Sequence, residues 1–272
     1  MVMRIVELSD HPGAMLQEAS QHRLAARERA QAQFEDALAQ RHLRVEDAQR
    51  ARDQARAQHR WWAWLRCVVA LRRERRAVPG PPVAAGGASD REKILEAGIE
   101  GEDKVAAGLG GVLGDDWTLF RGYRNRRGEI DHLLLGPQGL VAIEGKHRNA
   151  TVYCDGDDWR FVKYDRYGNP VERGRIADGR GRSPSVQLNE PASLLEGFLR
   201  SRGHPVSVER VVLLTHPRSR VGTCTNLTVH IATSTDYVTG LLKGPPIKAD
   251  QLGQIEQLIL RDHRFHESRR SP

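Results

Sequence analysis

The chain has 272 residues, a net charge of +7 and three widely separated cysteines, Cys67, Cys154 and Cys224. That length allows one good-sized core with an extension or a small second domain, and the charge suits a polyanionic partner or, equally, an arginine-rich proteome. The cysteine pattern argues against a disulfide framework and a zinc site. Since residues 1–12 lack an apolar signal-peptide core, we expect a cytoplasmic protein.

Residues 14–60 contain almost no Gly or Pro and are rich in Ala, Gln, Arg and Glu, which predicts one long helix. Two sets of positions recur every seven residues, with several polar breaks: Leu24, Gln31, Leu38, Val45 and Arg52, and Arg27, Phe34, Arg41, Ala48 and Ala55. The heptads predict a helix that pairs with a second copy or folds back on itself. The pattern favours an oligomerising or spacer helix over a basic arm on DNA.

An aromatic, apolar run follows at Trp61–Leu71 and precedes the basic cluster Arg72, Arg73, Arg75 and Arg76. The run is about half the ~20 residues that span a bilayer, and Arg66 interrupts it. Two interpretations remain. The tryptophans and arginines could seat an interfacial helix on an anionic membrane surface, or the patch could pack against the rest of the protein or a partner helix.

Prolines and glycines between Val78 and Ser89 predict a linker. The sequence therefore divides into a helical, coiled-coil-like extension at 1–77, a linker at 78–89 and an α/β domain at 90–265. Ser89 or Asp90 is expected to cap a helix that runs to about Leu113. Glu102 falls between apolar positions of this helix, and by spacing alone it is an ordinary exposed glutamate.

The most informative stretch is a predicted β-hairpin. After a strand at Trp117–Tyr123, two apolar runs at 128–135 and 140–146 are joined by the turn Gly136-Pro137-Gln138-Gly139. Polar residues interrupt these runs at Asp131, Glu144 and Lys146. Glu144 and Lys146 point to one side because a strand alternates its faces, and Asp131 reaches that side if the register allows. Such charges are costly to bury, and a divalent metal held by the carboxylates would offset the cost.

The rest of the chain predicts a second hairpin at Thr151–Val162, and then a polar, Gly-rich loop at 163–183. Long loops of this kind are functional or disordered, so the loop is either a phosphate clamp or a solvated insertion. The candidate nucleic-acid-binding residues in it are Arg173, Arg175, Arg180 and Arg182. A helix at 184–200 carries Gln187 in its first turn. Strands at 208–215 and 227–232 and helices at 235–242 and 249–263 complete the prediction.

An ordered set of motifs resembles the nuclease-related domain, NERD, of the PD-(D/E)xK nuclease superfamily. The set consists of Gly101-Glu102 on a helix, Gly128–His132, Gly139–Lys146 with its Glu-x-Lys triplet, and the later Trp159. The resemblance covers about residues 95–215. It implies a restriction-endonuclease-like mixed sheet flanked by helices, here preceded by the long N-terminal helix. It also implies a metal-site role for Glu102 and a place beside the active site for Gln187.

The leading functional hypothesis is a metal-dependent nuclease that hydrolyses phosphodiester bonds, in DNA processing or defence. Asp131 and Glu144 would hold Mg²⁺ or Mn²⁺, Glu102 could complete the shell, and Lys146 and Gln187 would act on the attacking water or the phosphate. His132, His147 and Glu129 are expected to face away from Asp131. One alternative is a non-catalytic nucleic-acid-binding or assembly module that uses a nuclease-like fold. Another is a membrane-associated scaffold built on Trp61–Arg76.

Overall fold

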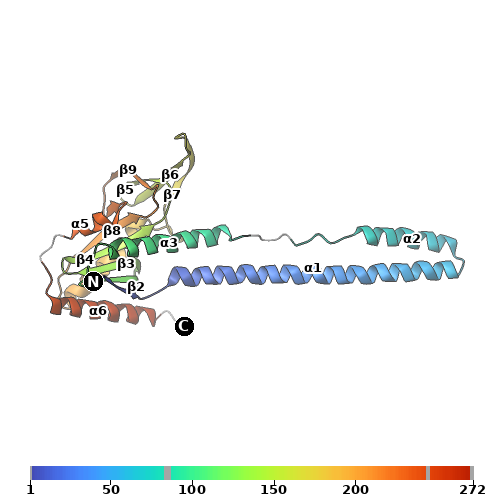
Figure 1. Cartoon of the computed structure of the whole chain (residues 1–272), viewed down its shortest axis with the longest axis horizontal. Coiled ribbons are helices and arrows are strands. Elements are labelled where there is room, and N and C mark those ends of the chain that lie inside the picture. Colours follow the sequence, from blue (N-terminus) through green and yellow to red (C-terminus); the bar gives the residue numbers. More distant parts are fainter. Residues whose placement is uncertain (1, 83–86, 243–245, 270–272) are drawn as a thin grey trace. The chain divides into compact units, whose positions relative to one another are not determined.

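The computed structural model describes residues 2–82, 87–242 and 246–269. They form a mixed α/β protein whose chain divides into two compact units, one made of Met1–Met15 and Lys93–Pro272 and the other of Leu16–Glu92. The elements are labelled in Figure 1. The predicted fold class, mixed sheets flanked by helices with a long N-terminal helix, is confirmed.

The unit Leu16–Glu92 is built on two helices that lie side by side (Figure 1). Helix α1 (His11–Ala57) is followed by helix α2 (Trp61–Arg76), and the chain reverses at His59, which has a φ of 53°. Arg44 pairs with Glu74 at 3.2 Å, and Arg41 donates to the Arg75 carbonyl. The N-terminal helix therefore folds back on α2, which is one of the two predicted arrangements.

The aromatic start of α2 is exposed to solvent. Trp61 is 67% and Trp62 82% exposed, and Trp61 meets Trp64 edge to face. Among the described residues, no helix has both the length and the apolar character that crossing a bilayer requires. Part of the predicted linker, residues 83–86, lies outside the described residues.

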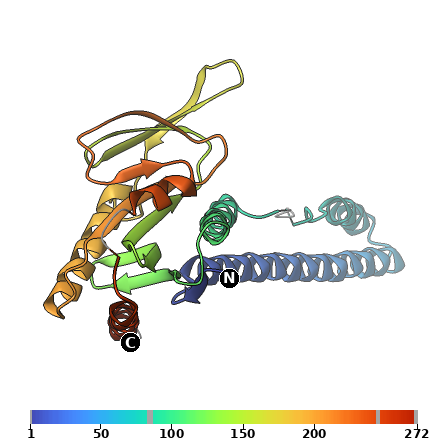
Figure 2. The same cartoon turned by 60° about the vertical axis from the view of Figure 1, so that its left-hand side comes forward.

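The other unit is organised around a six-stranded sheet with the order β1-β2-β3-β4-β8-β10. Its strands are β1 (Arg4–Glu7), β2 (Thr118–Asn125), β3 (Gly128–Gly136), β4 (Gly139–Lys146), β8 (Val208–Leu214) and β10 (His230–Ala232). The predicted hairpin forms β3 and β4, and β4 then pairs in parallel with β8. Parallel pairing of these two strands requires a crossover, which the chain makes through residues 147–207 (Figure 2).

One pair of helices covers each face of this sheet. Helices α4 (Pro184–Ser201) and α6 (Ala249–Glu267) pack on the face that carries Leu133 and Ala142. Helices α3 (Asp90–Gly110) and α5 (Thr235–Leu241) pack on the face that carries Leu134 and Val141. Alternate residues of one strand thus pack into the cores on opposite sides of the sheet. The hairpin sequence is apolar nearly throughout for this reason.

A second sheet has the order β7-β6-β5-β9. It contains β5 (Thr151–Asp155), β6 (Asp158–Tyr164), β7 (Pro170–Arg175) and β9 (Arg220–Thr225). The β6–β7 hairpin extends from the rest of this sheet in both views (Figures 1 and 2). The predicted hairpin at Thr151–Val162 is confirmed by the β5–β6 pairing.

Several local predictions were wrong. Residues 163–183 are not one irregular loop, because Pro170–Arg175 pairs with β6, and an exposed edge strand needs no apolar pattern. Strand β9 was not predicted, and β10 covers only His230–Ala232 of the expected 227–232. Residues 1–77 were expected to form a helical extension, but Arg4–Glu7 forms a strand that pairs in parallel with β2. Because this pairing joins two segments that lie far apart in the sequence, no local pattern predicted the strand.

Candidate active site

Asp131 and Glu144 lie next to each other on neighbouring strands. The register pairs His132 of β3 with Ile143 of β4, and one further step brings Asp131 opposite Glu144 on the same face. The Gly145 N–H donates to Asp131 Oδ2 at 2.9 Å. The hairpin therefore brings the two carboxylates together at the point where β4 reaches its Glu-x-Lys triplet.

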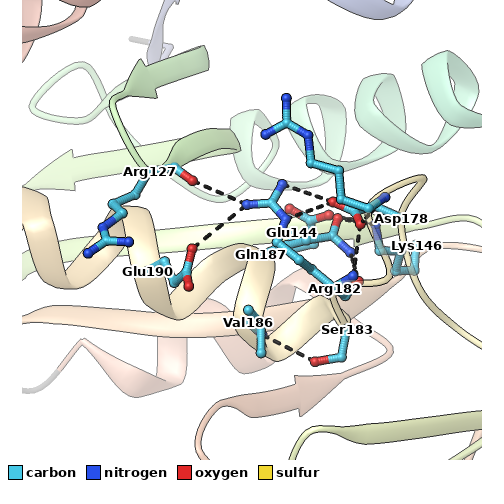
Figure 3. A network of polar contacts seen from close by, with 10 residues as sticks. Arg127, Glu144, Lys146, Asp178, Arg182, Ser183, Val186, Gln187 and Glu190 are labelled. Atoms are coloured by element: carbon cyan, nitrogen blue, oxygen red, sulfur yellow. Dashed lines mark hydrogen bonds and ion pairs between the residues drawn. The ribbon is translucent and has the colours of Figure 1, made fainter.

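Lys146 completes this group. Its Nζ lies 2.5 Å from Glu144 Oε1, while the Glu144 side chain is 5% and the Lys146 side chain 26% exposed. The Gln187 Oε1, in the first turn of α4, lies 3.5 Å from the same Nζ. Figure 3 shows Glu144, Lys146 and Gln187 converging from strand and helix. We call Asp131, Glu144, Lys146 and Gln187 the hairpin cluster.

The charges of the hairpin cluster do not balance internally. Burial, followed by the neighbouring Glu144 carboxylate, raises the pKa of Asp131 well above its ordinary value. Burial alone would lower the pKa of Lys146, but the Glu144 and Asp131 carboxylates outweigh this effect and raise it. Two carboxylates thus share one ammonium, and a further positive charge at this position would favour the ionised form of Asp131.

Glu102 approaches from α3 on the opposite face of the sheet, where its carboxylate lies 3.5 Å from Arg121 Nη2. Burial raises the pKa of Glu102 to about 7, although Arg121 opposes the change. Its charge influences Asp131, but within residues 2–82, 87–242 and 246–269 no three His, Cys, Asp or Glu side chains are arranged to hold a metal ion. The structure therefore joins Asp131 and Glu144, while Glu102 pairs with Arg121 and its metal-site role stays a prediction.

A capped turn positions Gln187. Ser183 caps α4 by accepting the Val186 N–H at 3.3 Å, and the Gln187 Nε2 donates to the Arg182 carbonyl at 2.8 Å. Asp178 Oδ1 accepts the backbone N–H groups of Arg180 and Arg182, each at 2.9 Å, and its Oδ2 accepts Arg182 Nε at 2.9 Å. Asp178, which sequence reasoning did not single out, therefore organises the turn that holds Gln187 (Figure 3).

The four predicted arginines separate into two pairs. Arg180 and Arg182 line a cavity of about 590 Å³ together with Arg124, Arg126, Arg127 and Arg269. Arg173 and Arg175 lie instead on the exposed strand β7, where Arg175 pairs with Asp158 at 3.2 Å. The cavity adjoins the hairpin cluster, because the Arg182 carbonyl accepts the hydrogen bond from Gln187 Nε2 at 2.8 Å (Figure 3). The arginines of the β2–β3 turn were missed because they come from a separate part of the sequence.

Three polar residues were expected to face away from Asp131 toward the exterior. His132 does lie on the other face, but it is fully buried, and burial with the nearby Arg121 lowers its pKa to about 3. His147 is also covered, with its Nδ1 3.0 Å from Thr215 Oγ1. Glu129 forms a partly buried ion pair with Arg124. The expectation of outward-facing side chains was wrong because α3 and α6 cover these positions.

Comparison with known families confirms the resemblance. Residues 97–215 match the family model described as NERD, nuclease-related domain. The matched segment runs from α3 through β8 and contains every member of the hairpin cluster. Comparisons with curated proteins and with solved structures gave no significant match.

Proposed function

We propose that this chain is a metal-dependent nuclease that hydrolyses phosphodiester bonds of DNA, with residues 90–265 and the N-terminal strand as its catalytic part. The observation that carries the proposal is the pairing of Asp131 with Glu144 beside Lys146, within a segment that matches a nuclease-related domain. Such a reaction needs an activated water and neutralisation of the phosphate charge. The hairpin cluster contains groups of the right kind for both tasks.

The donor atoms suit Mg²⁺ or Mn²⁺. The Asp131 and Glu144 carboxylates, with the Gly145 carbonyl, would offer hard oxygen ligands. Burial and then the Glu144 carboxylate raise the pKa of Asp131, and a bound divalent cation would oppose both effects. When bound, the ion would supply Lewis acidity and lower the pKa of an attached water. Glu102, held by Arg121 across the sheet, would act on this site through its charge.

Lys146 would orient the attacking water or stabilise the charge that develops on the phosphate. Glu144 holds its ammonium in place, and Gln187 contacts the same ammonium at 3.5 Å. Arg180 and Arg182 would bind backbone phosphates beside the cluster, because they belong to a cavity with four further arginines. Arg173 and Arg175, on an exposed strand, would extend this basic surface along the substrate.

A cleavage panel tests this proposal. Purified full-length protein would be incubated with single- and double-stranded DNA and RNA, with Mg²⁺, Mn²⁺ or EDTA, alongside Glu144→Ala. We expect cleavage of DNA that requires the metal and is lost in the variant. Absence of metal-dependent cleavage on every substrate, or equal cleavage by Glu144→Ala, would remove the proposal in favour of a non-catalytic binding or assembly module.

For the helical unit, we propose attachment to an anionic membrane surface from the cytoplasmic side. The exposure of Trp61 and Trp62 supports this, together with four arginines at the end of the same helix. A flotation assay with vesicles containing phosphatidylserine tests it, and Trp61→Ser/Trp62→Ser serves as the variant. If wild-type protein stays in the dense fraction, the exposed face of α1–α2 is better assigned to pairing between copies of the chain.

A further inference from the structure

We propose that a cavity on the second sheet binds an unpaired nucleotide of the nucleic acid that enters the hairpin cluster. The cavity has a volume of about 800 Å³, and its lining includes Tyr153, Tyr164, Arg166, Arg218 and Arg220. None of these residues belongs to the hairpin cluster or to the arginine cavity beside Arg182. The proposal rests on the proposed nuclease function and narrows its substrate to a strand that has single-stranded nucleotides.

The chain connects this cavity directly to the hairpin cluster. Lys146 ends β4, and Asn149, which lines the cavity, lies three residues further along; three residues span at most about 11 Å. The segment after β8 runs beside this connection. Thr215 N–H donates to the Lys146 carbonyl at 3.1 Å, and Arg220 N–H donates to the Ala150 carbonyl at 3.1 Å. A strand held at Lys146 could therefore reach the cavity within a few nucleotides.

The lining of the cavity contains three arginines and one acid, so positive charge is in excess there. Within the described part of the chain, neither Arg218 nor Arg220 has an ion-pair partner. The acid of the lining, Asp165, is engaged locally, because its Oδ1 accepts the backbone N–H groups of Tyr167 at 2.8 Å and Asn169 at 2.9 Å. These features suit phosphate groups, which are bound by free guanidinium groups.

The two tyrosines provide an aromatic wall. Their hydroxyl groups are 3.0 Å apart, so the two side chains meet at their tips. A Cβ placed on Gly222 would lie 2.4 Å from Tyr153 Cε1, so the ring rests directly on the glycine backbone. A fixed ring beside free arginines is the arrangement on which unpaired bases stack. Bases of an intact duplex already stack on one another, so the cavity selects unpaired nucleotides.

Fluorescence anisotropy with the full-length protein in EDTA tests binding without cleavage. The probes are labelled single-stranded DNA, RNA of the same sequence, and blunt duplex DNA, each at several salt concentrations. Arg218→Gln/Arg220→Gln should lower the salt slope for single strands by about 1.4, at ~0.7 per lost phosphate contact. Tyr153→Ala should weaken binding about 5- to 150-fold through lost stacking, whereas Tyr153→Phe should retain most of the affinity.

The charge control is Arg261→Gln/Arg264→Gln, two exposed arginines on α6. Equal affinities of the two double variants, or a preference for blunt duplex over both single strands, would overturn the proposal. Loss of binding to DNA or RNA in Arg218→Gln/Arg220→Gln supports it and identifies the strand. Anisotropy does not require catalysis, so the binding result can be interpreted even if the cleavage panel fails. An unaffected Arg218→Gln/Arg220→Gln variant, in turn, would leave the proposed cleavage untouched.

Discussion

The Gly145 backbone N–H donates a hydrogen bond to Asp131 Oδ2 at 2.9 Å. This bond joins the acid of β3 to the residue between Glu144 and Lys146, so the hairpin backbone itself fixes the spacing of the two carboxylates. A Cβ on residue 145 would lie 3.8 Å from the same oxygen, which is ordinary contact. The backbone amide of residue 145, and not the small size of glycine, therefore holds the Asp131 side chain in place.

Gln187 is expected to act by positioning Lys146. Its amide spans the Lys146 ammonium at 3.5 Å and the Arg182 carbonyl at 2.8 Å. Gln187→Leu should lower kcat about 10- to 100-fold with little change in KM, because a small displacement of a reacting group is costly. Asn189→Ala, on the same helix but bonded to Thr228, is the control. Equal kcat values for the two variants would contradict this role.

Asp178 should stabilise the turn that contains Arg180 and Arg182 and leads into α4. Removal of its carboxylate leaves the Arg180 and Arg182 N–H groups without their acceptor, and hydrogen bonds to charged groups contribute about 1.5–3 kcal/mol. Asp178→Ala should therefore weaken DNA binding and lower the free energy of unfolding, as measured by anisotropy and urea titration. Asp178→Asn, which keeps one acceptor oxygen, should fall between Asp178→Ala and wild type. Identical behaviour of both variants to wild type would exclude this role.

Trp159 couples the second sheet to the start of α4. Its buried Nε1–H donates to Ser185 Oγ at 3.0 Å, and Ser185 Oγ contacts Ser183 Oγ at 2.9 Å. Trp159→Phe should lower the free energy of unfolding by about 1–3 kcal/mol, since it removes a buried donor and leaves a smaller ring. A double-mutant cycle with Ser185→Ala measures the coupling. Strictly additive effects of the two substitutions would show that the hydrogen bond contributes nothing.

Glu92 makes the helical unit sensitive to acid. Hydrogen bonds from the Ser89 N–H and then from Arg23 lower its pKa from 4.5 to about 2. A depressed pKa contributes stability above the ordinary value, and that stability is lost as the pH falls through the folded-state pKa. Glu92→Gln should thus lower the melting temperature at pH 7, and the difference from wild type should close between pH 4.5 and 2. A pH-independent difference in circular dichroism melts would refute this.

Local signals account for most of the fold. The Gly-Pro turn at 136–139 and the apolar runs beside it predicted β3 and β4, and Pro184 predicted the start of α4. Strands β1, β7 and β9 were not predicted, because their stability depends on pairing with distant segments rather than on their own composition. The fold-back of α1 on α2 was one of two arrangements that the heptads allow equally.

The candidate site was predictable where strand alternation governs it. Alternation placed Glu144 and Lys146 on one side, and the hairpin register then brought Asp131 to them. Glu102 could not be placed in this way, since the contact with Arg121 depends on how α3 packs on the sheet. Asp178 and the arginines of the β2–β3 turn were missed because turn capping and cavity lining leave no periodic signal in the sequence.

Titration of the full-length protein with Mn²⁺, followed by electron paramagnetic resonance of the free ion, shows directly whether Asp131 and Glu144 hold a metal ion. If Asp131 and Glu144 grip one ion between them, wild-type protein binds Mn²⁺ at a site that is lost in both Asp131→Asn and Glu144→Gln. Glu209→Gln, an acid with a half-exposed side chain on β8, should bind as wild type does. Unchanged Mn²⁺ binding in Asp131→Asn and Glu144→Gln would show that these carboxylates do not hold the ion.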